Sequence, residues 1–215
     1  MKGIRTSRRR VLRLMREHNL LAPSRTGPPR GPRNHDGTII PETIDTLSGT
    51  DMTTTWTTEG PASVFVAVDH HSAECVGIHA SRHGTRFEAL EPLRPGVREH
   101  FGGFAQETAS GLSVRHYHGS QYMSWAFQDE LRFLGTASSP AFVRAPEGNG
   151  CAERFIRTLK ENLLWVRRFD TIEELRQALL AFRESYNSTW LIAQNGFQTP
   201  KAVRHKQLSF AALAA

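Results

Sequence analysis

Hydrophobic residues in the first half of the chain follow the patterns of β-strands. Residues 63–69, Ser-Val-Phe-Val-Ala-Val-Asp, contain a continuous apolar run at 64–68 and predict a buried strand. β-branched residues at 50–58 predict a strand before it, and residues 74–79 predict a third strand after a short turn at 70–72. We expect these three strands to form an antiparallel meander.

Helical spacing of apolar residues appears after the third strand. It runs over residues 87–101, where Pro92 and Pro95 must interrupt or displace the helix. A strand is predicted at 112–117, and a second helix presents one apolar face over residues 123–134. Helix and strand therefore alternate in this part of the chain.

Helices dominate the C-terminal third. A Gly- and Pro-rich loop at 144–150 precedes a long helix that is predicted to begin at Cys151. Another helix is predicted to run to Tyr186 from Thr171, which forms a capping box with Glu174. The whole order, strands first, then alternation, then helices, predicts an α/β domain with a mixed sheet and flanking helices.

The N-terminal residues differ in composition from the rest. Residues 7–16 place three apolar side chains on one side and Arg9, Arg13 and Arg16 on the other, which predicts a short basic amphipathic helix. A segment rich in Pro and Gly follows and is typical of a linker. We therefore divide the chain into a basic helix (1–22), a linker (23–44), a main domain (45–203) and a C-terminal tail (204–215).

The positive charge of the chain is concentrated at its N-terminus. The 215 residues carry a formal net charge of +6, and residues 1–35 alone hold ten Lys and Arg against one acid. The remaining residues hold seventeen basic against twenty acidic side chains. Such a cationic segment favours contact with a polyanion, above all nucleic acid, because each neutralised phosphate releases counterions. A solvated tail that only aids solubility is the alternative.

Composition excludes several classes of protein. No apolar run reaches the roughly 18–20 residues of a membrane span, and the N-terminus lacks the apolar stretch of a signal peptide. Cys75 and Cys151 are far apart and form no Cys-x-x-Cys pair, so neither a disulfide framework nor a zinc knuckle is predicted. We expect reduced thiols in an intracellular protein.

Three sequence blocks carry the residue types that phosphoryl transfer requires. They read SGTDMT at 48–53, LSVRHYHGSQY at 112–122 and PEGNGCAERF at 146–155, and they are supported by FIRTLKE at 155–161, Tyr186-Asn187 and Thr199-Pro200. With these blocks, residues 45–203 closely resemble the catalytic domain of bacterial insertion-sequence transposases of the retroviral-integrase type. The resemblance implies a ribonuclease-H-like fold and metal-dependent cleavage and transfer of DNA strands.

In that family two Asp and one Glu hold two divalent cations, Mg²⁺ or Mn²⁺, which hard carboxylate oxygens bind well. Asp51 and Glu153 match the first and third acids and are the implied metal ligands. The second position holds Tyr117, and 35 residues separate it from Glu153, which is the spacing of the family. The alignment is therefore in register, and the chain departs from the pattern at one catalytic position.

The departure at Tyr117 predicts loss of catalysis. A phenol is uncharged at neutral pH and its bulk fills space meant for a metal ion. His116, His118 or Asp69 could complete the site instead. However, imidazole suits softer metals, and Asp69 has the position of a turn residue after a strand. We expect this copy to be an impaired enzyme.

Basic side chains near the third acid are candidates for DNA contact. Arg157 and Lys160 follow Glu153 by four and seven residues, so all three share one helix face, and the resemblance implies that Lys160 approaches DNA. An exposed Glu153–Arg157 salt bridge is the alternative. Asn149, between two glycines, suits either loop closure over DNA or an ordinary turn. On the N-terminal helix the candidates for phosphate contact are Arg8, Arg9, Arg10 and Arg13.

The resemblance also implies partners and location. They are transposon-end and target DNA, further copies of the chain or other transposase subunits, and the bacterial cytoplasm near the nucleoid. The N-terminal helix resembles the last helix of a helix-turn-helix region, of which only this remnant is present.

Other functions are weighed against the transposase interpretation. One rival is a non-catalytic remnant that binds DNA or transposase subunits, and another is a general ribonuclease-H-type nuclease. A zinc cluster of His70, His71 and Cys75 lacks a fourth ligand and a recognised spacing. A serine-hydrolase interpretation fails because Gly-x-Ser-x-Gly is absent.

Overall fold

The computed structural model describes residues 6–21, 39–141 and 146–214. The chain divides into two units, Met1–Asp36 and Gly37–Ala215. In the described part of the first unit, helix α1 (Arg8–Glu17) begins after Ser7, whose hydroxyl accepts a hydrogen bond from the Arg10 N–H, and no residue of α1 is buried. The predicted basic helix is therefore confirmed, whereas residues 22–38 of the predicted linker lie outside the described residues.

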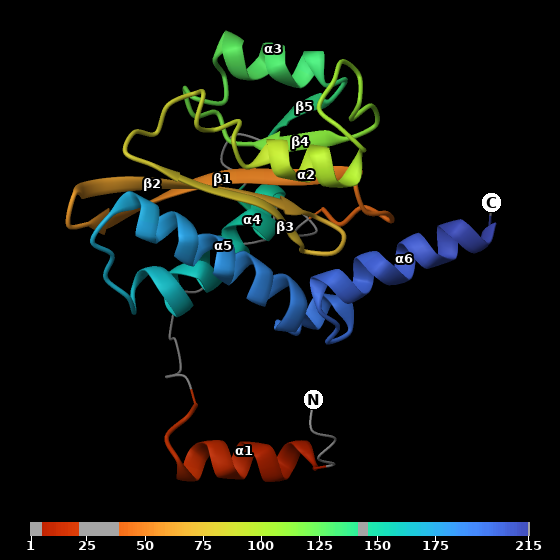
Figure 1. Ribbon diagram of the computed structural model, residues 1–215. Coiled ribbons are helices and arrows are strands. Elements are labelled where there is room, and N and C mark those ends of the chain that lie inside the picture. The colour runs from red at the N-terminus through yellow and green to blue at the C-terminus, as the bar shows by residue number, and fades with distance from the viewer. Residues whose placement is uncertain (1–5, 22–38, 142–145, 215) are drawn as a thin grey trace. The chain divides into compact units, whose positions relative to one another are not determined.

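The second unit is built on a five-stranded mixed sheet (Figure 1). Its strands run in the order β3-β2-β1-β4-β5, with β1–β2 and β2–β3 antiparallel and β1–β4 and β4–β5 parallel. The predicted meander and mixed sheet are confirmed. Strand β5 was not predicted, because Ala-Ser-Ser-Pro has no apolar run or alternation. The bounds are β1 (Leu47–Thr57), β2 (Gly60–Asp69), β3 (Cys75–Ser81), β4 (Ser113–His116) and β5 (Ala137–Pro140).

Helices cover both faces of this sheet, with α2 and α3 on one side and α4 and α5 on the other (Figure 1). Strand β2 feeds both layers: Val64, Val66 and Val68 pack with α4 and α5, while Phe65 and Ala67 pack with α2 and α3. Residues 64–68 are continuously apolar for this reason. The bounds are α2 (Leu93–His100), α3 (Trp125–Phe133), α4 (Gly150–Leu159), α5 (Ile172–Thr189) and α6 (Pro200–Ala214), with short helical turns η1 (Pro146–Asn149), η2 (Lys160–Leu164, a π-turn that continues α4) and η3 (Ala193–Asn195).

Local sequence signals explain where two of the helices begin. Helix α2 begins after Pro92 and holds Pro95 in its first turn, where a missing N–H costs no helical hydrogen bond. Helix α5 begins after Thr171, whose hydroxyl accepts from the Glu174 N–H at 3.1 Å. The Glu174 carboxylate reaches back to the N–H of Asp170 at 2.8 Å, one residue before the position that a standard capping box uses.

Described residues on both sides of the predicted main domain form hydrogen bonds with it. Before residue 45, the carbonyls of Ile39 and Pro41 already accept hydrogen bonds from the rings of His70 and His71, at 2.8 and 2.9 Å. After residue 203, helix α6 continues without a break, and the buried Arg204 binds Asp45 and Glu74. Tertiary hydrogen bonds and ion pairs therefore hold both flanking segments to the domain.

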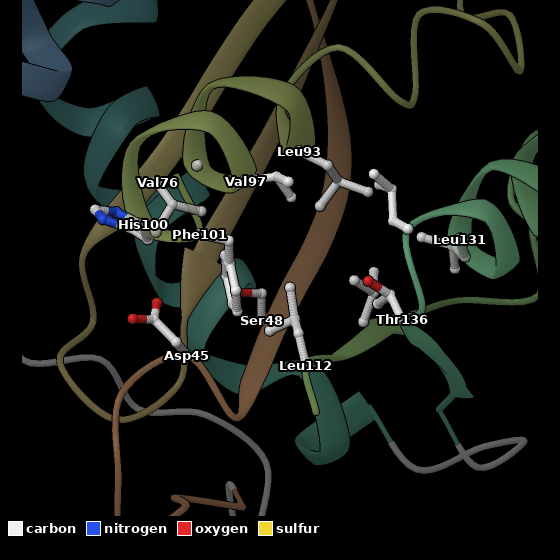
Figure 2. Close-up of a pocket in the computed structure, with 13 residues that line it drawn as sticks. Asp45, Ser48, Val76, Leu93, Val97, His100, Phe101, Leu112, Leu131 and Thr136 are labelled. Atoms are coloured by element: carbon white, nitrogen blue, oxygen red, sulfur yellow. The ribbon is translucent and has the colours of Figure 1, made fainter. Parts of the chain in front are cut away.

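A small, mainly apolar pocket lies in the layer between α2, α3 and the sheet (Figure 2). In Figure 2, the polar side chains of Asp45 and His100 lie at one end of the pocket. The side chains of Leu131 and Thr136 lie at the other end. The lining includes neither Asp51 nor Glu153, so this pocket is not the site that the sequence predicts. Among the described helices, none has the length and apolar character needed to cross a membrane.

Candidate active site

The three predicted site positions come together where β1, β4 and α4 meet. Strands β1 and β4 are parallel, with Gly49 paired with Arg115, and Asp51 and Tyr117 both follow two residues further along. Glu153 lies in the first turn of α4, which packs on the same sheet. Parallel pairing therefore sets Asp51 beside Tyr117, and α4 brings Glu153 to both.

Tyr117 and Glu153 form a direct contact. The Tyr117 hydroxyl donates a hydrogen bond to a carboxylate oxygen of Glu153, and both side chains are half-buried. The phenol therefore engages one oxygen of the Glu153 carboxylate. Among the described residues, no group of three or more His, Cys, Asp or Glu side chains could hold a metal ion. Two carboxylates and a neutral phenol do not fit the two-cation site of the family.

Asp51 sits in a partly dehydrated position. Burial raises the pKa of its carboxyl from its ordinary value of 3.8 to about 6. The hydrogen bond from the Met52 N–H, at 2.8 Å, opposes this rise; the negative charge of Glu153 adds to it, and the positive charge of Lys160 opposes it. Glu153 and Lys160 are thus both within electrostatic reach of Asp51.

The raised pKa of Asp51 predicts a loss of stability with rising pH. Between about pH 4 and 6 the folded chain holds a proton that the unfolded chain releases, so the free energy of unfolding falls as pH rises. The loss in free energy of unfolding is complete above about pH 6 and reaches up to about 3 kcal/mol. Urea unfolding from pH 4 to 7, in EDTA, should show this fall in the natural chain and a flatter profile in Asp51→Asn.

The matched control for this experiment is Asp129→Asn, which changes an exposed carboxylate paired with Arg132. It should follow the natural chain within about 0.5 kcal/mol across the range. Parallel profiles for the natural chain and Asp51→Asn would contradict the assignment of Asp51 as the dehydrated carboxyl.

The predicted DNA-contacting residues of the long helix occupy different environments. Arg157 is exposed and pairs with Glu161 at 3.0 Å, so the alternative pairing with Glu153 is not the one that forms. Lys160 is half-buried at the start of η2, and its charge acts on Asp51. Contact of either residue with DNA stays a prediction.

Asn149 has a structural role in the site. It is fully buried, and its amide donates to the carbonyl of Thr50 at 3.0 Å, which ties η1 to the strand that holds Asp51. A Cβ atom at Gly49 would lie 2.3 Å from the Asn149 side-chain oxygen, so the close approach requires glycine there. This contact joins the first and third sequence blocks; DNA contact by Asn149 stays a prediction.

Two of the three side chains that the sequence offers in place of the missing acid, His116 and Asp69, have other partners. His116 is buried and binds the Tyr117 carbonyl and the Ser138 hydroxyl, at 2.8 and 2.9 Å. Asp69 accepts from the N–H and hydroxyl of Ser72, which is the turn geometry expected after a strand. Among the described residues, His70, His71 and Cys75 do not form a group that could hold a metal ion.

The N-terminal arginines belong to the first unit and form no part of this site's described geometry. Arg8, Arg9 and Arg10 are exposed on α1, and Arg13 lies 3.6 Å from Glu17 one turn later. Their predicted phosphate contact rests on charge and exposure alone.

Arg115 is a charged residue near the site that the sequence did not single out. Arg115 lies in β4, two residues before Tyr117, and its side chain is buried. The available signal was an arginine inside a predicted buried strand, which is uncommon unless the charge has a partner.

Sequence comparisons show which known proteins this chain is similar to. Residues 135–190 match the family model described as "Integrase core domain". Together with the mixed sheet and its flanking helices, this match supports a transposase/integrase catalytic core of ribonuclease-H-like fold. The chain is 32% identical over 140 residues to the transposase for insertion sequence element IS904 of Lactococcus lactis subsp. lactis (strain IL1403). That alignment covers 65% of this chain and 53% of the transposase, so the chain spans about half the length of this relative.

Solved structures share the fold at low sequence identity. The catalytic core domain of BIV integrase matches with a TM-score of 0.55 and 17% identity over 78% of this chain and 99% of that one. The HTLV-2 integrase catalytic core domain in complex with magnesium matches with a TM-score of 0.55 and 15% identity, over 78% of this chain and 99% of that one. A chain of the simian T-cell lymphotropic virus intasome in complex with PP2A regulatory subunit B56 gamma matches with 0.59 and 17%, over 82% and 59%. These likenesses establish the fold.

Proposed function

We propose that this chain is a transposase core for DNA transposition that binds DNA but has lost metal-dependent strand cleavage and transfer. The hydrogen bond from Tyr117 to Glu153 carries this proposal. It puts an uncharged donor where the family has its second carboxylate, and it engages an oxygen that a cation would need. With Asp51 and Glu153 as the remaining acids, the donor set is too small for two divalent ions.

DNA binding is supported by positive charge beside Glu153 in the second unit and, separately, on α1 in the first. Arg157 is exposed and Lys160 half-buried on the helix of Glu153, and the exposed arginines of α1 add a second cationic segment. Phosphates attract such side chains with little dependence on base sequence. The proposal therefore assigns to the chain salt-dependent binding of duplex DNA.

This proposal is tested by measuring DNA binding and DNA cleavage with the same preparation. Fluorescence anisotropy with a labelled duplex, in a series of KCl concentrations, should give a Kd that rises steeply with salt. Arg157→Ala with Lys160→Ala should reduce the slope of log K against log salt by about 2. Arg176→Ala is the matched control, because Arg176 is partly exposed on α5, away from the site.

Two results would contradict the proposal. Binding that does not depend on salt or on the two α4 cations would remove the DNA-binding part. Mg²⁺- or Mn²⁺-dependent nicking of supercoiled plasmid by the natural chain would remove the claim of impairment, because another ligand would then complete the site.

A second candidate is a partner subunit that joins active transposase copies and lowers their activity. It is favoured by the intact fold beside a defective donor set: the strands and helices that position the site are all present, although the second acid is not. Mixing this chain with its Tyr117→Asp variant distinguishes the two. A partner subunit lowers nicking by the variant below the value expected from dilution, whereas an independent DNA-binding core only competes for DNA.

A further inference from the structure

Arg115 is a buried cation without an anionic partner among the described residues. Its relative exposure is 8%, and neither its Nε nor its Nη1 atom has a hydrogen-bond partner in that part of the chain. Buried guanidinium groups are ordinarily paired, because an uncompensated charge in the interior costs free energy. A buried guanidinium without a partner, beside a candidate site, is a group that could bind an anion.

Among the described residues, Arg115 forms no ion pair or hydrogen bond with an acid through Nε or Nη1. Its positive charge acts on His70 and His116, and burial is the main cause that lowers the pKa of each ring. Both rings are therefore neutral at pH 7. Burial also lowers the pKa of Arg115 itself, the direction expected for a cation held in a dehydrated place without a counter-charge.

The guanidinium group points toward the start of α4. A Cβ atom at Gly148 would lie 3.0 Å from Nη1 of Arg115, so the cation lies directly beside the residue that precedes the N-cap, Asn149. Asn149 makes no side-chain capping hydrogen bond to α4, and its Nδ2 donates to the carbonyl of Thr50. The positive end of a ten-residue helix and a buried guanidinium thus converge on one point.

We propose that Arg115 and the N-terminus of α4 form a binding site for a phosphate group next to the Tyr117–Glu153 pair. The guanidinium supplies the Nε and Nη1 donors, which have no partner among the described residues, and the helix end adds a favourable field for a tetrahedral oxyanion. The phosphate comes from the DNA backbone or from free phosphate. The first source rests on the proposed DNA binding, and the second does not.

Three variants and two ligands test this site. Arg115→Met removes the charge, Gly148→Ala keeps it but places a methyl group against Nη1, and Arg132→Met is the control, an exposed arginine paired with Asp129. Thermal unfolding is followed in potassium phosphate and in potassium chloride of equal ionic strength. Binding of a labelled DNA duplex is measured over a KCl series.

The site predicts that phosphate raises the melting temperature of the natural chain and of Arg132→Met, but not of Arg115→Met. DNA affinity should fall about tenfold or more in Arg115→Met, and the salt slope should fall by about 1. Without ligand, Arg115→Met should be at least as stable as the natural chain, because an unpaired buried charge has been removed. Gly148→Ala should weaken binding of both ligands.

The outcomes separate the two proposals. If the natural chain fails to bind DNA but phosphate stabilises it in an Arg115-dependent way, the site stands with free phosphate as its ligand and the DNA-binding proposal fails. If DNA binds equally well to the natural chain and to Arg115→Met, and phosphate affects both alike, the site is overturned. A large loss of ligand-free stability in Arg115→Met also overturns it, because the guanidinium would then be paired within the protein.

Discussion

Replacing Tyr117 by aspartate should give the chain metal-dependent DNA nicking. The substitution removes the hydroxyl that donates to Glu153 and puts a carboxylate where parallel pairing of β1 and β4 aligns it with Asp51. Three clustered carboxylates repel one another and are stabilised by divalent cations. We expect the nicking rate to rise by about 10²-fold or more, since groups that act as a unit lose most of their effect when one is missing.

The measurement is conversion of supercoiled plasmid to the open circle in Mg²⁺ and in Mn²⁺. The natural chain is compared with Tyr117→Asp, with the double variant Tyr117→Asp, Glu153→Ala, and with Tyr117→Asn. The asparagine variant is the matched control, because it has the size of aspartate without the charge. Only Tyr117→Asp should nick.

A second readout guards against loss of folding. Mg²⁺ should raise the melting temperature of Tyr117→Asp and leave that of the natural chain nearly unchanged, because ligand binding stabilises only a fold that has the site. If Tyr117→Asp is folded, gains stability from Mg²⁺ and still does not nick, the single substitution is not what disables this chain.

Removing the side chain of Arg204 should destabilise the protein strongly. Arg204 donates to both oxygens of Asp45, at 2.7 and 2.8 Å, and to Glu74, and the side chains of Arg204 and Glu74 are only 8% and 3% exposed. In Arg204→Ala the Glu74 carboxylate stays buried without its main partner. Loss of one partner of such a buried pair costs about 3–5 kcal/mol. Urea unfolding followed by circular dichroism measures this loss.

The matched control lies on the same helix. Lys201 pairs with Glu184 at 2.6 Å, but both side chains are substantially exposed, so Lys201→Ala should cost no more than about 1 kcal/mol. Comparable losses for the two variants would show that the Arg204 network does not anchor α6. A large loss for Arg204→Ala alone would establish that the domain extends beyond residue 203.

Elements with strong local signals were predictable from the sequence. The apolar run at 64–68 became part of β2, and the proline-interrupted pattern at 87–101 became α2 with its start after Pro92. By contrast, β5 and α6 had weak signals. Ala-Ser-Ser-Pro becomes a strand because it pairs with β4, and α6 is fixed by a buried arginine whose partners are about 130 and 159 residues away in the sequence.

The candidate site divides in the same way. Sequence by itself determined that Asp51, Tyr117 and Glu153 occupy the three positions of the family's acids. The spacing of these residues and the motif residues beside them can be seen without tertiary structure. Tertiary structure alone decided that the Tyr117 hydroxyl binds Glu153 and that burial raises the pKa of Asp51 to about 6. It also decided that Nε and Nη1 of Arg115 have no hydrogen-bond partner among the described residues. These properties depend on which side chains lie together in a buried region. Because those side chains are distant along the chain, only tertiary packing determines which of them meet.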